Sequence, residues 1–371
     1  MNFPKSEWVW TVPTVLKTLT KFKNERESKM SFETIRQIPS PAEIAQIVPI
    51  PESLKSLKAQ RDSEIRDILT GKVSKFLAII GPCSADDENA VCEYTKRLAK
   101  VQEEIKDKVY IIPRIYTNKP RTTGEGYKGM LHQPNPVEEP NMLDGILSIR
   151  RLHVRIMEEA GFTSADEMLY PDNLIYVEDL LSYIAIGARS SENQQHRLTS
   201  SGIDVPVGMK NPMSGDLSVM YNSIYAAQHP HTFIYQREEV QTSGNPLAHG
   251  ILRGSVNRHG ENIPNYHYED LLLATQLYRE KNLENPFIVV DTNHSNSKKQ
   301  HLEQSRIVKD ILYSRNHNKE IFDTVKGLLI ESYLVDGAQG INDGIYGKSI
   351  TDPCIGIEKT EELLYYLAEN V

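Results

Sequence analysis

The sequence predicts an α/β fold, a (β/α)8 barrel preceded by an N-terminal extension. From about residue 74 onward, short runs of apolar and β-branched residues recur, and most are separated by stretches with helical spacing. The runs expected to form the eight strands cover residues 76–80, 109–115, 167–169, 183–187, 205–210, 232–236, 287–291 and 327–331. Strands that alternate with helices indicate a parallel sheet, and eight of them favour a closed barrel over an open, doubly wound sheet.

Two parts of the chain differ in pattern. Residues 1–51 are rich in Lys, Ser, Thr and Pro and show little periodicity, so we expect an N-terminal arm that is a candidate oligomer interface; a partly disordered extension is the alternative. Residues 52–371 are expected to form the catalytic barrel. Within it, Val91, Tyr94, Leu98, Val101 and Ile105 recur every three or four residues, as on the buried face of a helix.

Composition narrows the function classes. A net charge of −8 argues against nucleic acid as a partner. No apolar run reaches the length of about 18 residues that a membrane span needs, and no signal peptide is recognisable, so we expect a cytoplasmic protein without a membrane partner. Three cysteines are too few for a disulfide scaffold. Neither G-x-G-x-x-G after the first strand nor a Walker sequence occurs, which leaves dinucleotide and P-loop chemistry without support.

Basic residues gather at the predicted carboxyl-terminal strand ends, where barrel enzymes place their active sites. They are Arg114, Lys119, Arg121, Arg189, Lys210 and Arg253. A single such cation is usually a solvated surface group, but a ring of them in an acidic protein favours a site for phosphate and carboxylate groups. Ser191 begins a predicted capping box over residues 191–194, which would direct a helix N-terminus to the same region.

A second set at the same strand ends consists of Cys83, His294, Glu331 and Asp352. Taken alone, Cys83 could be a core cysteine and His294 a hydrogen-bonded loop histidine. Glu331 and Asp352 could each be a helix cap or an ion-pair partner. Together, a thiolate, an imidazole and two carboxylates suit a divalent metal ion such as Mn, Fe, Co or Zn. A metal ion beside a polyanion pocket indicates a Lewis acid acting on phosphorylated substrates. Cys92, on the predicted helix face, is expected to serve packing.

Several segments carry a family resemblance. They are Gly81-Pro82-Cys83-Ser84, residues 114–122, Gly187-Ala188-Arg189, residues 208–211, Leu252-Arg253-Gly254, residues 294–300, Ile330-Glu331-Ser332 and residues 347–352. In this order they resemble the type I 3-deoxy-D-arabino-heptulosonate 7-phosphate (DAHP) synthases, also called phospho-2-dehydro-3-deoxyheptonate aldolases. The resemblance runs from about residue 33 to the end of the chain.

The resemblance implies roles for individual residues. Cys83, His294, Glu331 and Asp352 would hold the metal ion, and Asp352 would also face substrate. The residues implied to surround phosphoenolpyruvate are Arg114, Lys119, Ala188 (through its N–H), Arg189, Lys210 and Arg253. Those implied for erythrose 4-phosphate are Lys119, Pro120, Arg121 and Thr122. Lys119, Glu167, Arg189, Lys210 and His294 would act in catalysis, with Glu167 positioning a water molecule.

The implied reaction is a transferase reaction, the entry step of the shikimate pathway toward chorismate and the aromatic amino acids. C3 of phosphoenolpyruvate attacks the aldehyde carbon of erythrose 4-phosphate, water adds to C2, and inorganic phosphate leaves. The sister family, the 3-deoxy-manno-octulosonate 8-phosphate synthases, is expected to have a Lys-Ala-Asn-Arg loop where this chain has Lys119-Pro120-Arg121-Thr122. This difference favours the four-carbon aldehyde, erythrose 4-phosphate, as the substrate. Alternatives are another metal-dependent barrel aldolase for sugar phosphates and an inactive sugar-phosphate sensor. A homodimer or homotetramer is expected.

Cys354 lies two residues after Asp352, a predicted metal ligand. We therefore expect its sulfur to approach Cys83 when the metal ion is absent. Two thiols within reach can form a disulfide under oxidising conditions. The metal-free protein is thus expected to be sensitive to air.

Overall fold

The structure is a computed structural model that describes residues 31–371. Most of the predicted arm, residues 1–30, lies outside the described residues, and its assignment as an interface stays a prediction. Residues Ser40–Val371 form one compact unit. Residues 40–51, which the sequence pattern assigns to the arm, therefore belong with the barrel: Val48 accepts a hydrogen bond from Arg150 Nε at 2.8 Å.

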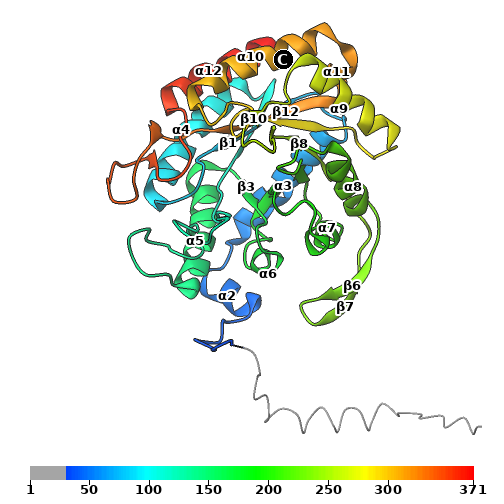
Figure 1. The fold of residues 1–371 in the computed structure, drawn as a ribbon. Coiled ribbons are helices and arrows are strands. Elements are labelled where there is room, and N and C mark those ends of the chain that lie inside the picture. The colour runs from blue at the N-terminus through cyan, green and yellow to red at the C-terminus, as the bar shows by residue number, and fades with distance from the viewer. Residues whose placement is uncertain (1–30) are drawn as a thin grey trace, which may run out of the picture. The chain divides into compact units, whose positions relative to one another are not determined.

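Eight parallel strands form the wall of a barrel in the order β2-β1-β12-β11-β8-β5-β4-β3. Figure 1 shows β1, β12, β8 and β3 of this wall with helices around them. They are β1 (Phe76–Gly81), β2 (Val109–Pro113), β3 (Ser164–Glu167), β4 (Leu181–Ile186), β5 (Val207–Lys210), β8 (His249–Leu252), β11 (Ile288–Asp291) and β12 (Val325–Glu331). The two ends of this order, β2 and β3, meet at an isolated parallel bridge between Arg114 and Ala165. The prediction of a (β/α)8 barrel is confirmed.

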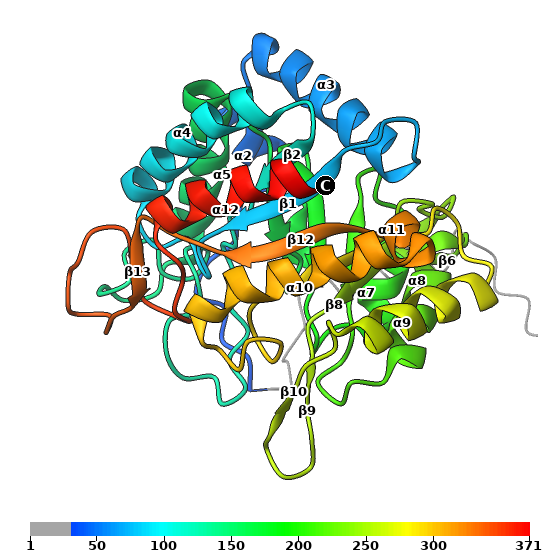
Figure 2. The ribbon, with the colours of Figure 1, turned by 90° about the horizontal axis from the view of Figure 1, so that it is seen from above.

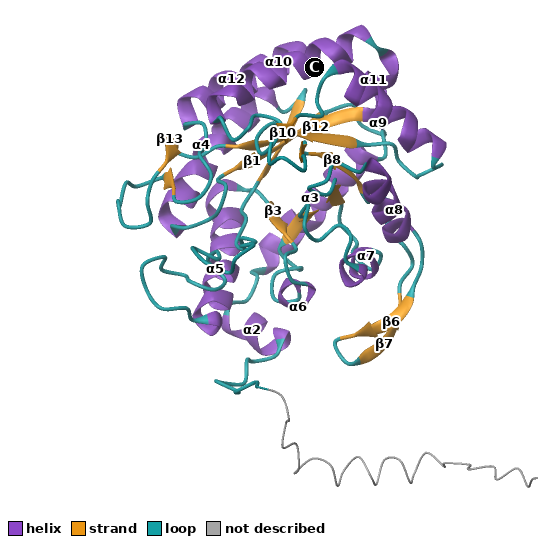
Figure 3. Ribbon diagram, in the orientation of Figure 1, coloured by secondary structure: helices purple, strands orange, loops and turns teal. Residues whose placement is uncertain are grey.

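Helices cover the outside of the barrel (Figure 3). They are α4 (Glu88–Ile105), α5 (Met142–Ala160), α6 (Pro171–Leu174), α7 (Gln194–Ser200), α8 (Leu217–Gln228), α9 (Tyr268–Glu280), α10 (Gln304–His317), α11 (Lys319–Thr324) and α12 (Ile357–Asn370). Helix α4 begins where the Asp87 side chain accepts a hydrogen bond from Ala90 N–H. All five apolar positions predicted for its inner face are buried.

The barrel interior is filled by alternate strand residues. Leu77 and Ile79 of β1 share one core cluster with inward side chains of β2, β4, β8 and β11. Helix α3 (Glu52–Leu69) contributes Ile65 and Ile68 to the same cluster. It also contacts residues at the strand beginnings, since Tyr110 Oη donates to Glu64 at 2.8 Å. Helix α3 therefore closes the amino-terminal end of the barrel and leaves the carboxyl-terminal end open.

The sixth barrel strand differs from the prediction. The run at 232–236 forms β6 (Thr232–Tyr235), which pairs with β7 (Glu238–Gln241) in an antiparallel hairpin that extends below α8 in Figure 1. Its side chains alternate between exposed and half-buried, whereas every residue of β8 is buried. The prediction of 232–236 as a barrel strand is wrong because an alternating pattern describes a strand with one solvated face, while barrel strands are buried on both faces.

Smaller elements decorate the barrel. They are α2 (Pro41–Ile47), the 3-10 helix η2 (His301–Glu303), β9 (Ser255–Val256) with β10 (Asn262–Ile263), and β13 (Val335–Ala338) with β14 (Lys348–Ser349). The β9–β10 hairpin projects away from the barrel in Figure 2. Among the described residues, no helix has both the length and the apolar character needed to cross a membrane.

Candidate active site

A cavity of about 220 Å³ opens among the loops at the carboxyl-terminal ends of the strands. Its lining contains all six predicted cations together with Glu167, Ala188, Pro120, His294 and Asp352. The further lining residues are Gly187, Ser190, Met213, Val256, Asn262, Ser295, Lys299 and Thr351. Thr122 is exposed in a turn and does not line this cavity, so its contact with substrate remains a prediction.

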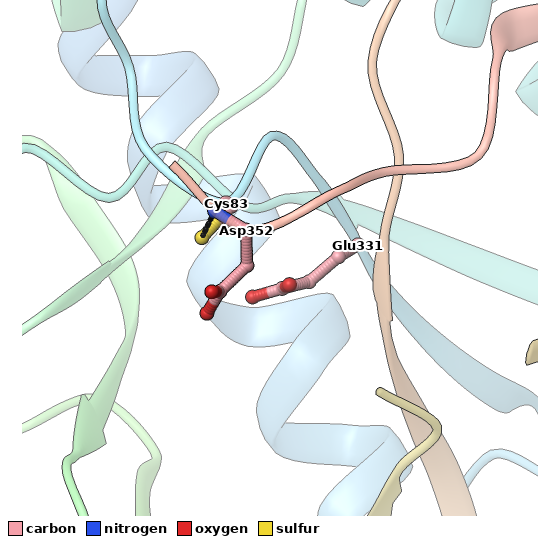
Figure 4. A group of neighbouring side chains, drawn as sticks. All are labelled: Cys83, Glu331 and Asp352. Atoms are coloured by element: carbon pink, nitrogen blue, oxygen red, sulfur yellow. Dashed lines mark hydrogen bonds between the residues drawn. The ribbon is translucent and has the colours of Figure 1, made fainter. Parts of the chain in front are cut away.

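Three of the four predicted metal ligands meet beneath the cavity (Figure 4). Donor atoms of Cys83, Glu331 and Asp352 lie within 4.8 Å of one another. Glu331 ends β12, Cys83 follows β1 by two residues, and the Asp352 N–H donates to Cys83 Sγ at 3.3 Å. A thiolate with two carboxylates fits a divalent transition metal ion, so these residues suit the predicted group.

His294 lies at the edge of this cluster. Its Nε2 is 3.8 Å from Glu331 Oε1, and its Nδ1 is 2.7 Å from Asp291 Oδ2. The residue has a positive φ of 47°, a backbone conformation that non-glycine residues rarely adopt. Metal-binding histidines usually have a carboxylate beside their second ring nitrogen, and Asp291 is the carboxylate in that place, although the two atoms do not meet hydrogen-bond geometry here.

The sequence interpretation did not single out Asp291. It ends β11, three residues before His294, and its side chain is fully buried. Burial raises the pKa of this carboxyl, but His294, Lys210 and Arg114 together lower the pKa well below its usual range. The signal that could have found it is the rule already applied to its neighbours, because it too ends a predicted strand.

Positive side chains surround the donor cluster. Arg114 Nη1 is 2.6 Å from Glu331 Oε1, and Lys119 Nζ is 3.0 Å from Cys83 Sγ. Burial raises the pKa of Glu331, yet Arg114 and His294 lower it more. For Cys83, burial and Glu331 raise the pKa of the thiol against the opposing effect of Lys119. A buried thiol with a raised pKa needs a strong positive partner to ionise, which a coordinated metal ion supplies.

The opposite wall holds buried and rim cations. Lys210 Nζ lies 3.8 Å from Glu167 Oε2 and 3.7 Å from Asp291 Oδ2. Arg253 is 5% exposed and donates to Ser295 Oγ at 3.2 Å, with no carboxylate within 4.0 Å in the described chain. Arg189 is exposed on the rim, and its side chain has no ion pair within 4.0 Å to any described residue. Arg189 and Arg253, like Arg121, therefore form no ion pair within 4.0 Å in the described part of the chain.

The backbone around Arg253 is held in one conformation. Asn211 accepts a hydrogen bond from Arg253 N–H at 2.9 Å and donates to Gly254 O at 2.9 Å. Gly254 has a φ of 73°, and a Cβ there would lie 2.8 Å from the Ile263 carbonyl oxygen. Only glycine meets both conditions, so this turn fixes where the Arg253 guanidinium enters the cavity.

The predicted helix cap at Ser191 is wrong. Helix α7 begins at Gln194, and its cap is Asn193, whose side chain accepts from His196 N–H. Ser191 instead sits in a turn, where its N–H donates to Gly187 O at 3.1 Å. Residues 191–193, which the sequence pattern assigned to the start of the helix, form part of the turn after β4 instead.

Fold and site together define a barrel enzyme that pairs a metal-ligand cluster with cations for phosphate and carboxylate groups. Residues 49–365 match the model of the DAHP synthetase I family. The chain belongs to this family.

Relatives at the level of whole chains agree with this assignment. The chain is 36% identical to a phospho-2-dehydro-3-deoxyheptonate aldolase of Haemophilus influenzae, over 92% of this chain and 93% of the relative. It is 34% identical to the Phe-sensitive enzyme of Escherichia coli K12, over 94% and 98%. A solved aldolase structure of the same name from Francisella tularensis matches with a TM-score of 0.85 and 30% identity, covering 92% of this chain and 98% of that one.

Proposed function

We propose that the cavity condenses phosphoenolpyruvate with D-erythrose 4-phosphate and water to give DAHP and inorganic phosphate. Membership of the DAHP synthetase I family makes the chain an enzyme of this aldolase type, a transferase at the first step of aromatic amino-acid biosynthesis. The observation that carries the proposal is a metal-ligand cluster at the base of a cavity whose opposite wall holds Arg189 and Arg253 without carboxylate partners.

Phosphoenolpyruvate is assigned to the wall formed by Arg189, Lys210 and Arg253. A guanidinium matches phosphate or carboxylate bidentately, while the Lys210 ammonium acts as a compact charge. Burial lowers the pKa of Lys210, and Glu167 and Asp291 oppose that effect. Arg114, Lys119 and the Ala188 N–H complete this side of the site. Their fixed positive charge also favours departure of the phosphate from C2.

Erythrose 4-phosphate is assigned to the outer part of the cavity, where Pro120 and Arg121 lie. Arg121 Nε donates to Tyr127 O at 2.8 Å, which orients the guanidinium from the protein side. Thr122 lies at the exposed end of the same loop. Lys119 is half-buried between the part of the cavity assigned to phosphoenolpyruvate and the part assigned to erythrose 4-phosphate, so it is placed to contact both substrates.

Cys83, His294, Glu331 and Asp352 would hold a divalent metal ion, for which Mn, Fe, Co and Zn all suit the donor set. When bound, such an ion polarises the aldehyde oxygen. Asp291 would hold the His294 ring with Nε2 toward the donor cluster. Lys299, at 2.9 Å from Asp352 Oδ1, would fix that carboxylate in the same way.

Glu167 is assigned to orient the water that adds to C2 and to accept its proton. Its carboxylate lies in the cavity wall next to Lys210 and packs against Gly187. A Cβ at residue 187 would lie 2.6 Å from Glu167 Oε1, so a larger residue there would displace the Glu167 carboxylate. The tetrahedral centre formed by water then expels inorganic phosphate, and the released electron pair leaves with it.

We further propose a cytoplasmic enzyme that acts as a homodimer or homotetramer. Both statements rest on composition and on the family. A different metal-dependent sugar-phosphate aldolase would release no phosphate, and an inactive sensor would turn over neither substrate.

The proposal is tested with purified protein and both substrates, with and without a chelator. The loss of phosphoenolpyruvate absorbance and the release of inorganic phosphate are followed together. We expect equal rates of both, and we expect chelation to stop both until a divalent metal ion is restored. Substrate consumption without phosphate release would exclude the proposed reaction, and full activity in the chelator would exclude the metal ion.

A further inference from the structure

A second pocket lies at the amino-terminal end of the barrel, opposite the active site. Its volume is about 390 Å³, and it lies below the beginnings of the adjacent strands β1, β2 and β12. Residues that line it include Lys75, Phe76, Lys108, Arg315 and Lys326. Figure 2 shows β1 and β12 side by side beneath α10 and α12, with α11 near the beginning of β12.

Arg315, on α10, is the most buried charge of this pocket. It is 5% exposed, its Nε donates to Val325 O at 2.7 Å, and its Nη1 has no hydrogen-bond partner. The guanidinium lies between two rings, 4.7 Å from the centroid of Phe76 and 4.6 Å from that of Phe322. Two rings and one backbone oxygen orient this cation without neutralising it.

No carboxylate of the described chain lies within 4.0 Å of Arg315. Burial alone lowers the pKa of its guanidinium to about 10, and no negative group opposes the effect. A buried cation without a counter-ion is costly, and proteins normally pair such a group. A negatively charged ligand in the pocket would supply the missing partner.

The other charged residues of the pocket increase its positive character. Lys75, Lys108 and Lys326 line it, against one acid, Asp323. Asp323 is already paired, because Lys319 Nζ lies 2.9 Å from its carboxylate. Val371 also lines the pocket, and no ion pair within 4.0 Å joins it to these cations in the described chain. Four cations thus face the pocket against Asp323 and the terminal carboxylate of Val371, so the net charge facing the pocket is positive.

We propose that this pocket binds a small phosphate-bearing anion. Arg315 would supply a guanidinium for the phosphate oxygens, and the three lysines would supply the charge that a dianion requires. Ile68, Val73 and Phe322 form apolar walls, and the volume exceeds what one phosphate fills. The geometry therefore favours a phosphomonoester, with inorganic phosphate as its minimal form.

This site is separate from the catalytic cavity. Lys326 stands near the beginning of β12 and Glu331 at its end, so roughly 16 Å of strand separates them at about 3.3 Å per residue. No residue lines both cavities. The proposal does not depend on the reaction assigned to the catalytic cavity.

The test measures phosphate binding by calorimetry at constant ionic strength, with metal-loaded, full-length protein. Arg121→Ala and Arg189→Ala are combined as a background, so that phosphate contacts in the catalytic cavity are reduced. Lys210 and Arg253 remain in the catalytic cavity, so these two changes weaken phosphate binding there, and the binding that is lost with a pocket variant reports on the second pocket. In that background we expect inorganic phosphate still to bind. Adding Arg315→Met, which keeps an unbranched apolar stem, or Lys326→Met should weaken phosphate at least tenfold.

The matched control is Lys309→Met, which removes a charge from the same helix outside the pocket. It should leave phosphate affinity unchanged. Two measurements establish that the pocket variants fold: their circular dichroism, and the turnover of Arg315→Met and Lys326→Met made without the background changes. Absence of phosphate binding in the background, or equal affinity in both pocket variants and the control, would overturn the proposal. A tighter complex with glycerol 3-phosphate than with inorganic phosphate would identify phosphomonoesters as the ligand, and equal affinity would identify the free anion.

Discussion

At the carboxyl-terminal end of the barrel, buried cations lie beside carboxylates, whereas at the amino-terminal end Arg315 has none. Arg114 is held by Glu331 at 2.6 Å, and Lys210 lies between Glu167 and Asp291. These pairs keep catalytic groups charged and in place while the protein is alone. Among the described residues, Arg121, Arg189 and Arg253 at one end and Arg315 at the other lack such partners, and they indicate where an anion from outside is expected to bind.

The largest expected effect concerns the donor cluster. Cys83→Ser replaces the thiolate by a hydroxyl that stays protonated, so metal binding should weaken and turnover should fall by about 10³-fold. Metal content and turnover are measured on the same samples. Cys92→Ser is the matched control, because Cys92 is buried on α4 away from the cluster, and it should be nearly silent. A metal-replete, fully active Cys83→Ser protein would contradict the ligand assignment.

A somewhat smaller effect separates the two substrates. Loss of a bidentate arginine–phosphate contact should cost about 2–4 kcal/mol of transition-state stabilisation. Arg189→Ala should therefore abolish phosphoenolpyruvate binding in calorimetry, while Arg121→Ala should leave that binding nearly intact and raise the KM for erythrose 4-phosphate. Similar losses of phosphoenolpyruvate affinity in both variants would show that the cavity is not divided as assigned.

The Asp291 carboxylate is expected to act through its neighbours. Asp291→Asn should reduce metal affinity or activity by about 10–100-fold, because the His294 ring loses the negative charge 2.7 Å from its Nδ1. The folded-state pKa of Asp291 lies below its unfolded value, so the ionised group stabilises the fold above that value, and this contribution is lost as the pH falls through the folded pKa. The Tm difference between Asp291→Asn and the unmodified protein should thus shrink on acidification from about pH 5. A Tm difference independent of pH would show that the charge of Asp291 is unimportant for stability.

The smallest expected effect on the loaded enzyme is that of Cys354→Ser. Cys354 Sγ accepts a hydrogen bond from Cys83 N–H at 3.4 Å, so the two cysteines are neighbours. Metal-loaded Cys354→Ser should turn over nearly normally. After metal removal, the unmodified protein should lose activity in air and regain it with a dithiol and metal, whereas Cys354→Ser should resist. Equal inactivation of both stripped proteins would rule out the disulfide as the cause.

Much of the fold and the site follows from local sequence because barrel strands are short, buried and end at a common rim. That rule brought Cys83, Glu331 and Asp352 together although they are far apart in the chain. Strand β8 was missed because its four residues include a histidine and a glycine, and a more typical β pattern at 232–236 stood just before it. Burial on both faces is decided by packing, which the sequence does not display.

Positions within loops were less predictable than strand ends. The pattern at Ser191 fits a helix cap, yet the hydrogen bond of its N–H to Gly187 O places it in a turn. Thr122 lies in a turn whose exposure depends on the path of the loop between β2 and α5. In the sequence, Arg315 looks like any other charged residue of a helix. Its neighbours Phe76 and Phe322 belong to other elements, so neither they nor the absence of a nearby carboxylate can be seen from the residues around it in the chain.

The closure between β2 and β3 has a consequence for how the enzyme moves. β1 and β2 pair over five positions, but β2 and β3 are joined by the Arg114–Ala165 bridge and by Ile115 N–H to Ala165 O at 2.8 Å. Thr117 N–H to Asp166 Oδ1 at 2.9 Å adds one more bond between these two segments. Local opening requires least free energy where fewest hydrogen bonds must break, so we expect β2 and β3 to separate before β1 and β2 do. Arg114 forms the bridge to Ala165 and also pairs with Glu331. Separation of β2 from β3 and ligand binding in the active site are therefore linked equilibria. Ligands that fix Arg114 therefore slow amide hydrogen exchange at Ile115, far more than at the paired strands on the opposite side of the barrel.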